Sequence, residues 1–197
     1  MIDESARDAQ EPSAEEDQQG QLSPEALLEV LSEQADGAAL FPGSLREQYF
    51  FAYDLLLDQG LIARHIKGLR PAKIARVLNH RLIWPYYFPP ANSALPTLER
   101  TNQREDHVWG LLYRATEKDF TKLERYLMVP NRYHRHAVTA MDRGGRRFQA
   151  FTYVLTTRDL TPQLPSASYI ERLVEAARSR RLPEEWVEQL QAVEVAD

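Results

Sequence analysis

The chain of 197 residues contains no cysteine. This excludes disulfide bonds, thiolate metal sites and a cysteine nucleophile, and it is typical of a protein from the reducing cytoplasm. No apolar run approaches the roughly 18 residues that a membrane-spanning helix needs. The acidic first residues lack an apolar core segment, so they do not predict a secretory signal. From these absences we expect a cytoplasmic protein that does not bind a membrane.

Motifs for cofactors, metals and nucleic acids are also missing. The sequence has no Gly-rich phosphate-binding loop and no motif typical of a Ser-His-Asp catalytic triad. Alternation places His134 and His136 on one face of a strand, but no third ligand follows at a suitable spacing. Two arginine clusters, 143–147 and 178–181, lack interleaved aromatic residues. We therefore expect no metal, no cofactor and no nucleic-acid partner.

Charge is divided unevenly along the chain. Residues 1–36 carry eleven acidic residues and one basic residue, a net charge of −10, whereas the whole chain carries −5. The remaining residues therefore carry +5. Residues 1–22 are acidic and poor in apolar side chains, which predicts a disordered tail. Residues 23–36 predict a short amphipathic helix, with Ser23 as its N-cap and Pro24 at its first position.

The apolar residues of this predicted helix allow two interpretations. They are Leu27, Leu28, Val30 and Leu31. The helix can pack on its own domain, as N-terminal helices commonly do. Alternatively, residues 1–36 form a docking arm that lays these side chains in the groove of another protein. We adopt the docking arm as the working hypothesis, and a protein partner is expected from it.

Residues 37–197 alternate strand and helix patterns, as expected for one α+β domain. Strands are predicted at 49–52, 107–113, 133–140 and 147–155, and residues 72–79 and 80–84 predict either one strand or two. Helices are predicted at 58–66, at 118–126, from Ser166 and from Pro183. The segment 85–96 holds four of the twelve prolines, which predicts a loop without regular structure. Its three adjacent aromatic residues, 86–88, either cover the core or meet a ligand or partner.

The order of these segments resembles the γ-glutamylcyclotransferase-like, or AIG2-like, family. The resemblance rests on F-A-Y at 51–53, V-W-G-L-L-Y at 108–113 with the following helix, Y-H-R-H-A-V at 133–138, and P-S-A-S-Y with a later L-P near the C-terminus. These matches run from about Tyr49 to Leu190. The fold implied by the resemblance is a small mixed β-barrel flanked by helices, with a cavity at one end; here it follows an acidic N-terminal extension.

The chemistry implied by the resemblance depends on one carboxylate. In this family a glutamate in L-D-x-x-E-G-V acts as general acid/base while 5-oxoproline leaves. The matching residues here place Leu127 at the glutamate position and Met128 at the glycine position. The family's Gly-Ser-Asn loop is replaced by Asp54, Leu55 and Leu56. Because a leucine cannot transfer a proton, the resemblance implies a pseudoenzyme, acting as an accessory or partner-binding protein.

A divergent cyclotransferase or amide-processing enzyme is the alternative function. In that case Asp54 or Glu124 would be the relocated acid/base, and apolar neighbours would raise the pKa of Asp54. Asp54 also has a purely structural interpretation as the N-cap of the helix that follows. The predicted ligand pocket at the barrel end consists of Tyr53, Leu55, Leu56, Leu127 and Tyr133.

Overall fold

The computed structural model describes residues 47–101, 103–157 and 159–196. The predicted acidic tail and the predicted helix at 23–36, with its four apolar residues, lie outside these residues. Five strands close into a barrel in the order β1-β5-β2-β6-β7. Their bounds are β1 Gln48–Ala52, β2 Arg70–Leu78, β5 His107–Ala115, β6 Tyr133–Asp142 and β7 Arg147–Leu155.

Strand β1 closes the barrel and makes it mixed. It pairs antiparallel with β5 and parallel with β7. Phe50, Phe51 and Ala52 are at most 1% exposed, as expected for a strand that is covered on both faces. A Cβ atom on Gly110 of β5 would overlap the Ala52 carbonyl oxygen and lie 2.7 Å from the Phe51 ring. Only glycine therefore lets β5 pass this close to β1.

The prediction of an irregular loop at 85–96 is wrong. Strand β3, His80–Phe88, and strand β4, Ser93–Arg100, form a separate two-stranded sheet joined by the 3₁₀ turn η2, Pro89–Ala91. The pairing shifts between Ile83 and Tyr86, opposite Thr97 and Leu95. Pro85 and Pro96 both fall in this irregularity, where the regular ladder is interrupted and the missing amide hydrogens do the least damage.

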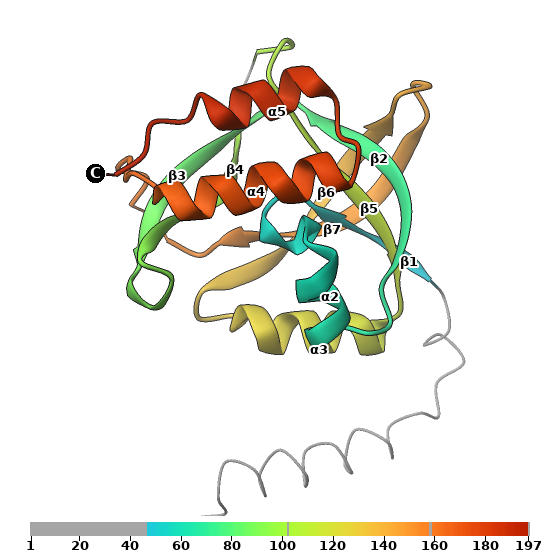
Figure 1. Cartoon of the computed structure of the whole chain (residues 1–197). Helices are drawn as coiled ribbons and strands as arrows, with labels where there is room; N and C mark the ends of the chain where they lie inside the picture. Colours follow the sequence, from blue (N-terminus) through green and yellow to red (C-terminus); the bar gives the residue numbers. More distant parts are fainter. Residues whose placement is uncertain (1–46, 102, 158, 197) are drawn as a thin grey trace, which may run out of the picture. The chain divides into compact units, whose positions relative to one another are not determined.

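In the described part of the chain, four α-helices flank the barrel (Figure 1). They are α2 Gln59–His65, α3 Glu117–Leu127, α4 Ala167–Ser179 and α5 Glu184–Gln191. A capping box of Thr116 and Asp119 starts α3, and the Ser166 side chain caps α4 by accepting the Tyr169 amide hydrogen. Helices α4 and α5 pack side by side. None of the helices in the described part of the chain is long and apolar enough to cross a membrane.

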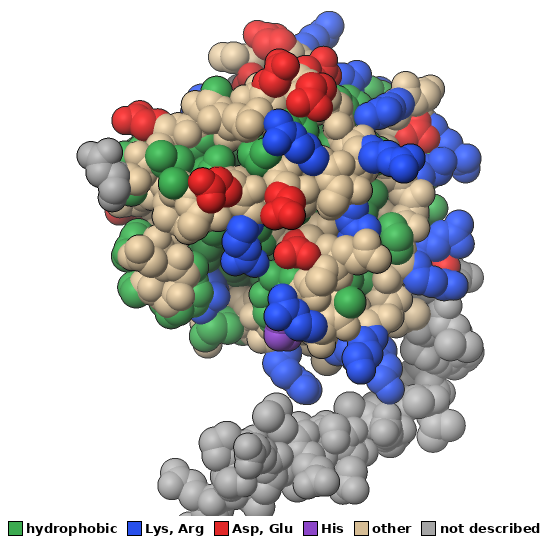
Figure 2. All heavy atoms as spheres, in the orientation of Figure 1, with side chains coloured by type: hydrophobic (Ala, Val, Ile, Leu, Met, Phe, Trp, Pro, Cys, Tyr) green, Lys and Arg blue, Asp and Glu red, His purple; other side chains and the backbone are tan. Residues whose placement is uncertain are grey.

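The predicted fold class is therefore confirmed as α+β, a small mixed barrel with flanking helices. The face that carries α4 and α5 is mixed in charge. Acidic side chains gather over α5, whereas Lys and Arg side chains line the right-hand and lower edges (Figure 2). Outside 85–96, the observed elements follow the apolar runs of the sequence, and side-chain caps start α2, α3 and α4.

Candidate functional site

The chain turns sharply where β1 ends, and two aspartates cap the turns that follow. Asp54 is the N-cap of the 3₁₀ turn η1, Leu55–Leu57, and its carboxylate accepts the Leu56 amide hydrogen at 2.9 Å. Asp58 is the N-cap of α2 and accepts the Gly60 amide hydrogen at 2.7 Å. The structural interpretation of Asp54 is thus observed for η1, while the longer helix has a cap of its own.

Asp54 is also buried among tyrosines. The residue is 9% exposed, and burial raises the pKa of its carboxyl group from 3.8 to about 6, against the opposing effect of the Leu56 amide. Burial, and after it the negative charge of Asp54, raises the pKa of four tyrosine hydroxyls. These are Tyr53, Tyr126, Tyr133 and Tyr169. Segments distant in sequence, from the end of β1 to α4, therefore converge on one carboxylate.

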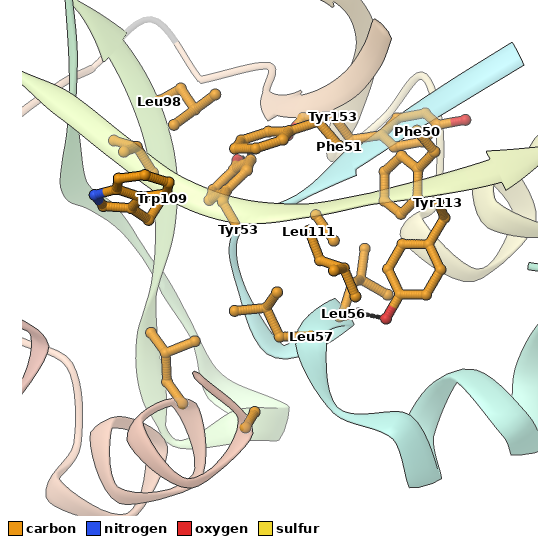
Figure 3. Close-up of a cluster of buried hydrophobic side chains, with 14 of the residues drawn as sticks. Phe50, Phe51, Tyr53, Leu56, Leu57, Leu98, Trp109, Leu111, Tyr113 and Tyr153 are labelled. Carbon is orange, nitrogen blue, oxygen red and sulfur yellow. Dashed lines mark hydrogen bonds between the residues drawn. The ribbon is translucent and has the colours of Figure 1, made fainter. Parts of the chain in front are cut away.

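The η1 turn is held in place by β5 and by the end of α4. The Tyr113 hydroxyl donates to the Leu56 carbonyl at 3.3 Å, as the dashed line in Figure 3 shows. Arg180 donates from Nε to the Leu57 carbonyl at 2.8 Å and from Nη2 to the Tyr113 hydroxyl at 3.1 Å. Burial raises the pKa of Tyr113 to about 12, so its hydroxyl stays protonated and available as a donor. These bonds fix the backbone that carries Asp54.

The end of α3 places Leu127 and Met128 next to each other in different environments. Leu127 is 5% exposed, whereas Met128 is 49% exposed and has φ 58°, in the left-handed region. A glycine adopts this conformation most easily. Since the resembling motif has glycine at this position, the backbone geometry agrees with the alignment that puts Leu127 at the glutamate position.

The residues predicted to form a ligand pocket are largely buried. Tyr53, Leu56, Leu127 and Tyr133 are each at most 5% exposed, and Leu55 is partly buried. The Tyr53 hydroxyl donates to the Tyr153 carbonyl at 2.7 Å. Tyr126 and Met128 are the large exposed apolar residues at the end of α3.

Glu124 belongs to a different group from Asp54. Arg135 donates from Nε to Glu124 at 2.8 Å and from Nη2 to Glu117 at 3.3 Å. The Tyr153 hydroxyl lies 3.4 Å from the same Glu124 oxygen, and the Arg135 guanidinium stacks over the Phe120 ring at 4.3 Å. Glu124, one helical turn before Leu127, thus connects α3 to β6 and β7.

Metal ligands do not gather at this site. In residues 47–101, 103–157 and 159–196, no three His, Asp or Glu side chains are arranged to hold a metal ion. His134 and His136 are exposed on β6 with their rings 6.2 Å apart. No sequence pattern marks Tyr169 or Arg180 as part of this site, because only the packing of α4 against η1 brings them near Asp54 and the Leu57 carbonyl.

Comparison with known proteins gives the fold and a family resemblance for part of the chain. Residues 107–190 match the model of the AIG2-like family. A solved structure of a γ-glutamyl cyclotransferase is 20% identical, with a TM-score of 0.71, and the match covers 77% of this chain and 90% of that one. An uncharacterized protein from Homo sapiens has the same identity and coverage and a TM-score of 0.70.

A more distant structure has the same fold. A γ-glutamyl cyclotransferase specific to glutathione from yeast is 12% identical, with a TM-score of 0.55 over 73% of this chain and 93% of that one. No curated protein sequence matches the chain significantly. Residues 107–190 are therefore similar to the AIG2-like family, and the described domain has the fold of the γ-glutamyl cyclotransferase structures.

Proposed function

We propose that this protein does not release 5-oxoproline and acts instead by binding another protein. The observation that carries the proposal is the buried Leu127 side chain at the position of the family's acid/base glutamate. A hydrocarbon side chain cannot accept or donate a proton. The loop position that holds the substrate in the family carries Asp54, Leu55 and Leu56, whose backbone is folded into the capped η1 turn.

The absence of the family reaction is tested by measuring 5-oxoproline release. The purified full chain is incubated with γ-glutamyl dipeptides and γ-glutamyl amines, with glutathione included as one substrate. We expect no release above the rate without protein. Release that disappears in Asp54→Asn or Glu124→Gln would contradict the proposal, because each exchange removes one ionisable carboxylate with little change of shape.

The partner-binding part of the proposal rests on residues 1–36. Their net charge is −10, and they contain Leu27, Leu28, Val30 and Leu31 in a pattern typical of an amphipathic docking helix. The full chain and a chain starting at Gly37 are compared for retention of one partner, purified from the native lysate and identified. We expect retention by the full chain only, and its loss in a full chain with Leu27→Ser and Leu31→Ser.

A control exchange separates the apolar contact from charge. Glu29→Gln keeps all four apolar residues and removes one negative charge, so we expect it to retain the partner. Equal retention by the full chain and the shortened chain would contradict the docking arm. It would then place any binding surface within residues 37–197.

A second function is favoured by one observation, the environment of Asp54. A buried carboxyl group with a pKa of about 6 can take up and release a proton near neutral pH. The surrounding tyrosines would orient a small amide substrate. Under this candidate, 5-oxoproline or amine release falls in Asp54→Asn and persists in Glu124→Gln, because Glu124 is neutralised by Arg135.

A further inference from the structure

The histidine pair on strand β6 presents two imidazole rings to solvent. His134 and His136 are both exposed, and their ring centroids lie 6.2 Å apart with the ring planes at 85°. The two side chains share one face of the strand because they are two residues apart. The sequence offers no third ligand at a suitable spacing, but a metal ion can complete its coordination with water.

The backbone between the two histidines is held in place by the barrel. Residues 134–136 pair with residues 152–154 of β7 in the antiparallel ladder. Arg135 lies on the opposite face of the strand, where it donates from Nε to Glu124 at 2.8 Å. A shift in register would break these contacts and turn both imidazoles to the other face. Only rotations of two exposed side chains are therefore needed to aim a nitrogen of each ring at a common ion.

The observed ring separation suits one shared ion. A metal–imidazole bond is about 2.0–2.1 Å long, which puts the centre of each ring about 3.2 Å from the ion. Two rings bound to one ion then have centroids about 4.5 Å apart when the bonds meet at a right angle, and about 6.4 Å apart when they point in opposite directions. The separation of 6.2 Å between His134 and His136 lies within this range.

The other histidines of the described residues are less free to turn toward an ion. The Nδ1 atoms of His80 and His107 lie 2.7 Å and 2.8 Å from backbone carbonyl oxygens, and the His65 ring packs against the Tyr126 ring with 4.9 Å between the centroids. The pair on β6 is thus the place where exposed, neighbouring imidazoles can act together.

We propose that His134 and His136 form a surface site for a divalent late transition metal, with water in the remaining coordination positions. Imidazole nitrogen suits Cu²⁺, Ni²⁺ and Zn²⁺, whereas Mg²⁺ and Ca²⁺ require oxygen ligands. For one set of ligands, Cu²⁺ binds most tightly. In residues 47–101, 103–157 and 159–196 no third His, Asp or Glu is arranged to join the pair, so the bound ion keeps positions open to a ligand from another molecule. The site is independent of Asp54 and of residues 1–36.

Amide resonances of the full chain, labelled with ¹⁵N, provide the test. Cu²⁺ is paramagnetic and broadens the signals of nearby nuclei. We expect a small amount of Cu²⁺ to remove first the signals of residues 133–137 and of the paired residues 152–154. Diamagnetic Zn²⁺ should shift the same signals, and these shifts give the affinity of this site alone. Mg²⁺ should leave them unchanged. Zn²⁺ should bind at least about tenfold more weakly to His134→Ala and to His136→Ala than to the wild type.

A spacing variant separates a shared ion from two independent histidines. The double exchange His136→Ala with Ala137→His keeps the number of histidines but moves the second ring to the other face of the strand. We expect it to bind Zn²⁺ as weakly as His136→Ala does. His65→Ala, at an exposed histidine of α2, should bind like the wild type. Unchanged dispersion of the spectrum shows that each variant is folded, and if the double variant does not fold, the two single exchanges decide.

Three results would overturn the proposal. They are earlier loss of signals elsewhere in the chain, unchanged affinity at this site in the single variants, and an affinity of the spacing variant equal to that of the wild type. Each of them would leave an adventitious ion only.

Discussion

Replacing Asp54 by asparagine should make the protein more stable at neutral pH. Burial raises the pKa of this carboxyl group from 3.8 to about 6 in the folded chain. The folded state thus binds its proton more tightly than the unfolded state. The stability contributed by that proton is fully present below pH 3.8, declines as the pH rises through the window between 3.8 and about 6, and is lost above it.

The size of the effect follows from the pKa difference. A difference of about two units corresponds to roughly 3 kcal/mol at pH 7. The Asp54→Asn exchange keeps an oxygen that can accept the Leu56 amide hydrogen, so the cap of η1 survives. The variant therefore avoids the cost of a buried charge and retains the local structure. We expect it to exceed the wild type by up to about 3 kcal/mol at pH 7 and to equal it near pH 4.

Urea unfolding at several pH values between 4 and 8 measures this difference. With a slope of roughly 2 kcal/mol per molar urea, the midpoint of Asp54→Asn at pH 7 should lie about 1 M or more above that of the wild type. Asp58→Asn is the matched control, because Asp58 caps α2 in a less buried position and asparagine caps equally well. Parallel stability profiles for the wild type and Asp54→Asn would refute the assignment of a buried, proton-binding carboxyl group.

Three further exchanges test the β1–β5 contact, the end of α3 and the η1 turn. Gly110→Ala should lower the free energy of unfolding by more than about 3 kcal/mol, because the new methyl group overlaps the Ala52 carbonyl. A midpoint of thermal unfolding equal to that of the wild type would contradict the close pairing of β1 and β5. Met128→Gly should raise the free energy of unfolding by roughly 0.5–1 kcal/mol, because glycine adopts the left-handed conformation without strain. A lower free energy of unfolding in urea would show that the exposed methionine side chain stabilises the fold by more than its backbone strain costs. Arg180→Gln should cost about 1–3 kcal/mol, because the Leu57 carbonyl loses a charged donor; no loss in thermal unfolding would contradict that contact.

The regular elements could be predicted because their signals are local. The aromatic run of β1, the V-W-G-L-L-Y run of β5 and the turn at Gly145, with φ 82°, each specify their structure within a few residues. The side-chain caps at Thr116 and Ser166 do the same for α3 and α4. Met128, at the C-terminal end of α3, has a left-handed backbone.

The hairpin of β3 and β4 could not be predicted from local signals. Its prolines argue against strands when each is considered alone. Only the pairing of the two strands shows that Pro85 and Pro96 fall together in one irregularity, where the ladder is interrupted. The local sequence does not specify which residues of two strands lie opposite each other.

The candidate site divides in the same way. The sequence alone determined most of the barrel strands, and it places a leucine, Leu127, near the end of α3 and an aspartate, Asp54, after β1. Only the tertiary structure decided that tyrosines from distant segments surround Asp54 and that Glu124 is paired with Arg135. These are contacts between residues far apart in the chain, and burial and charge pairing depend on which distant side chains the fold brings together.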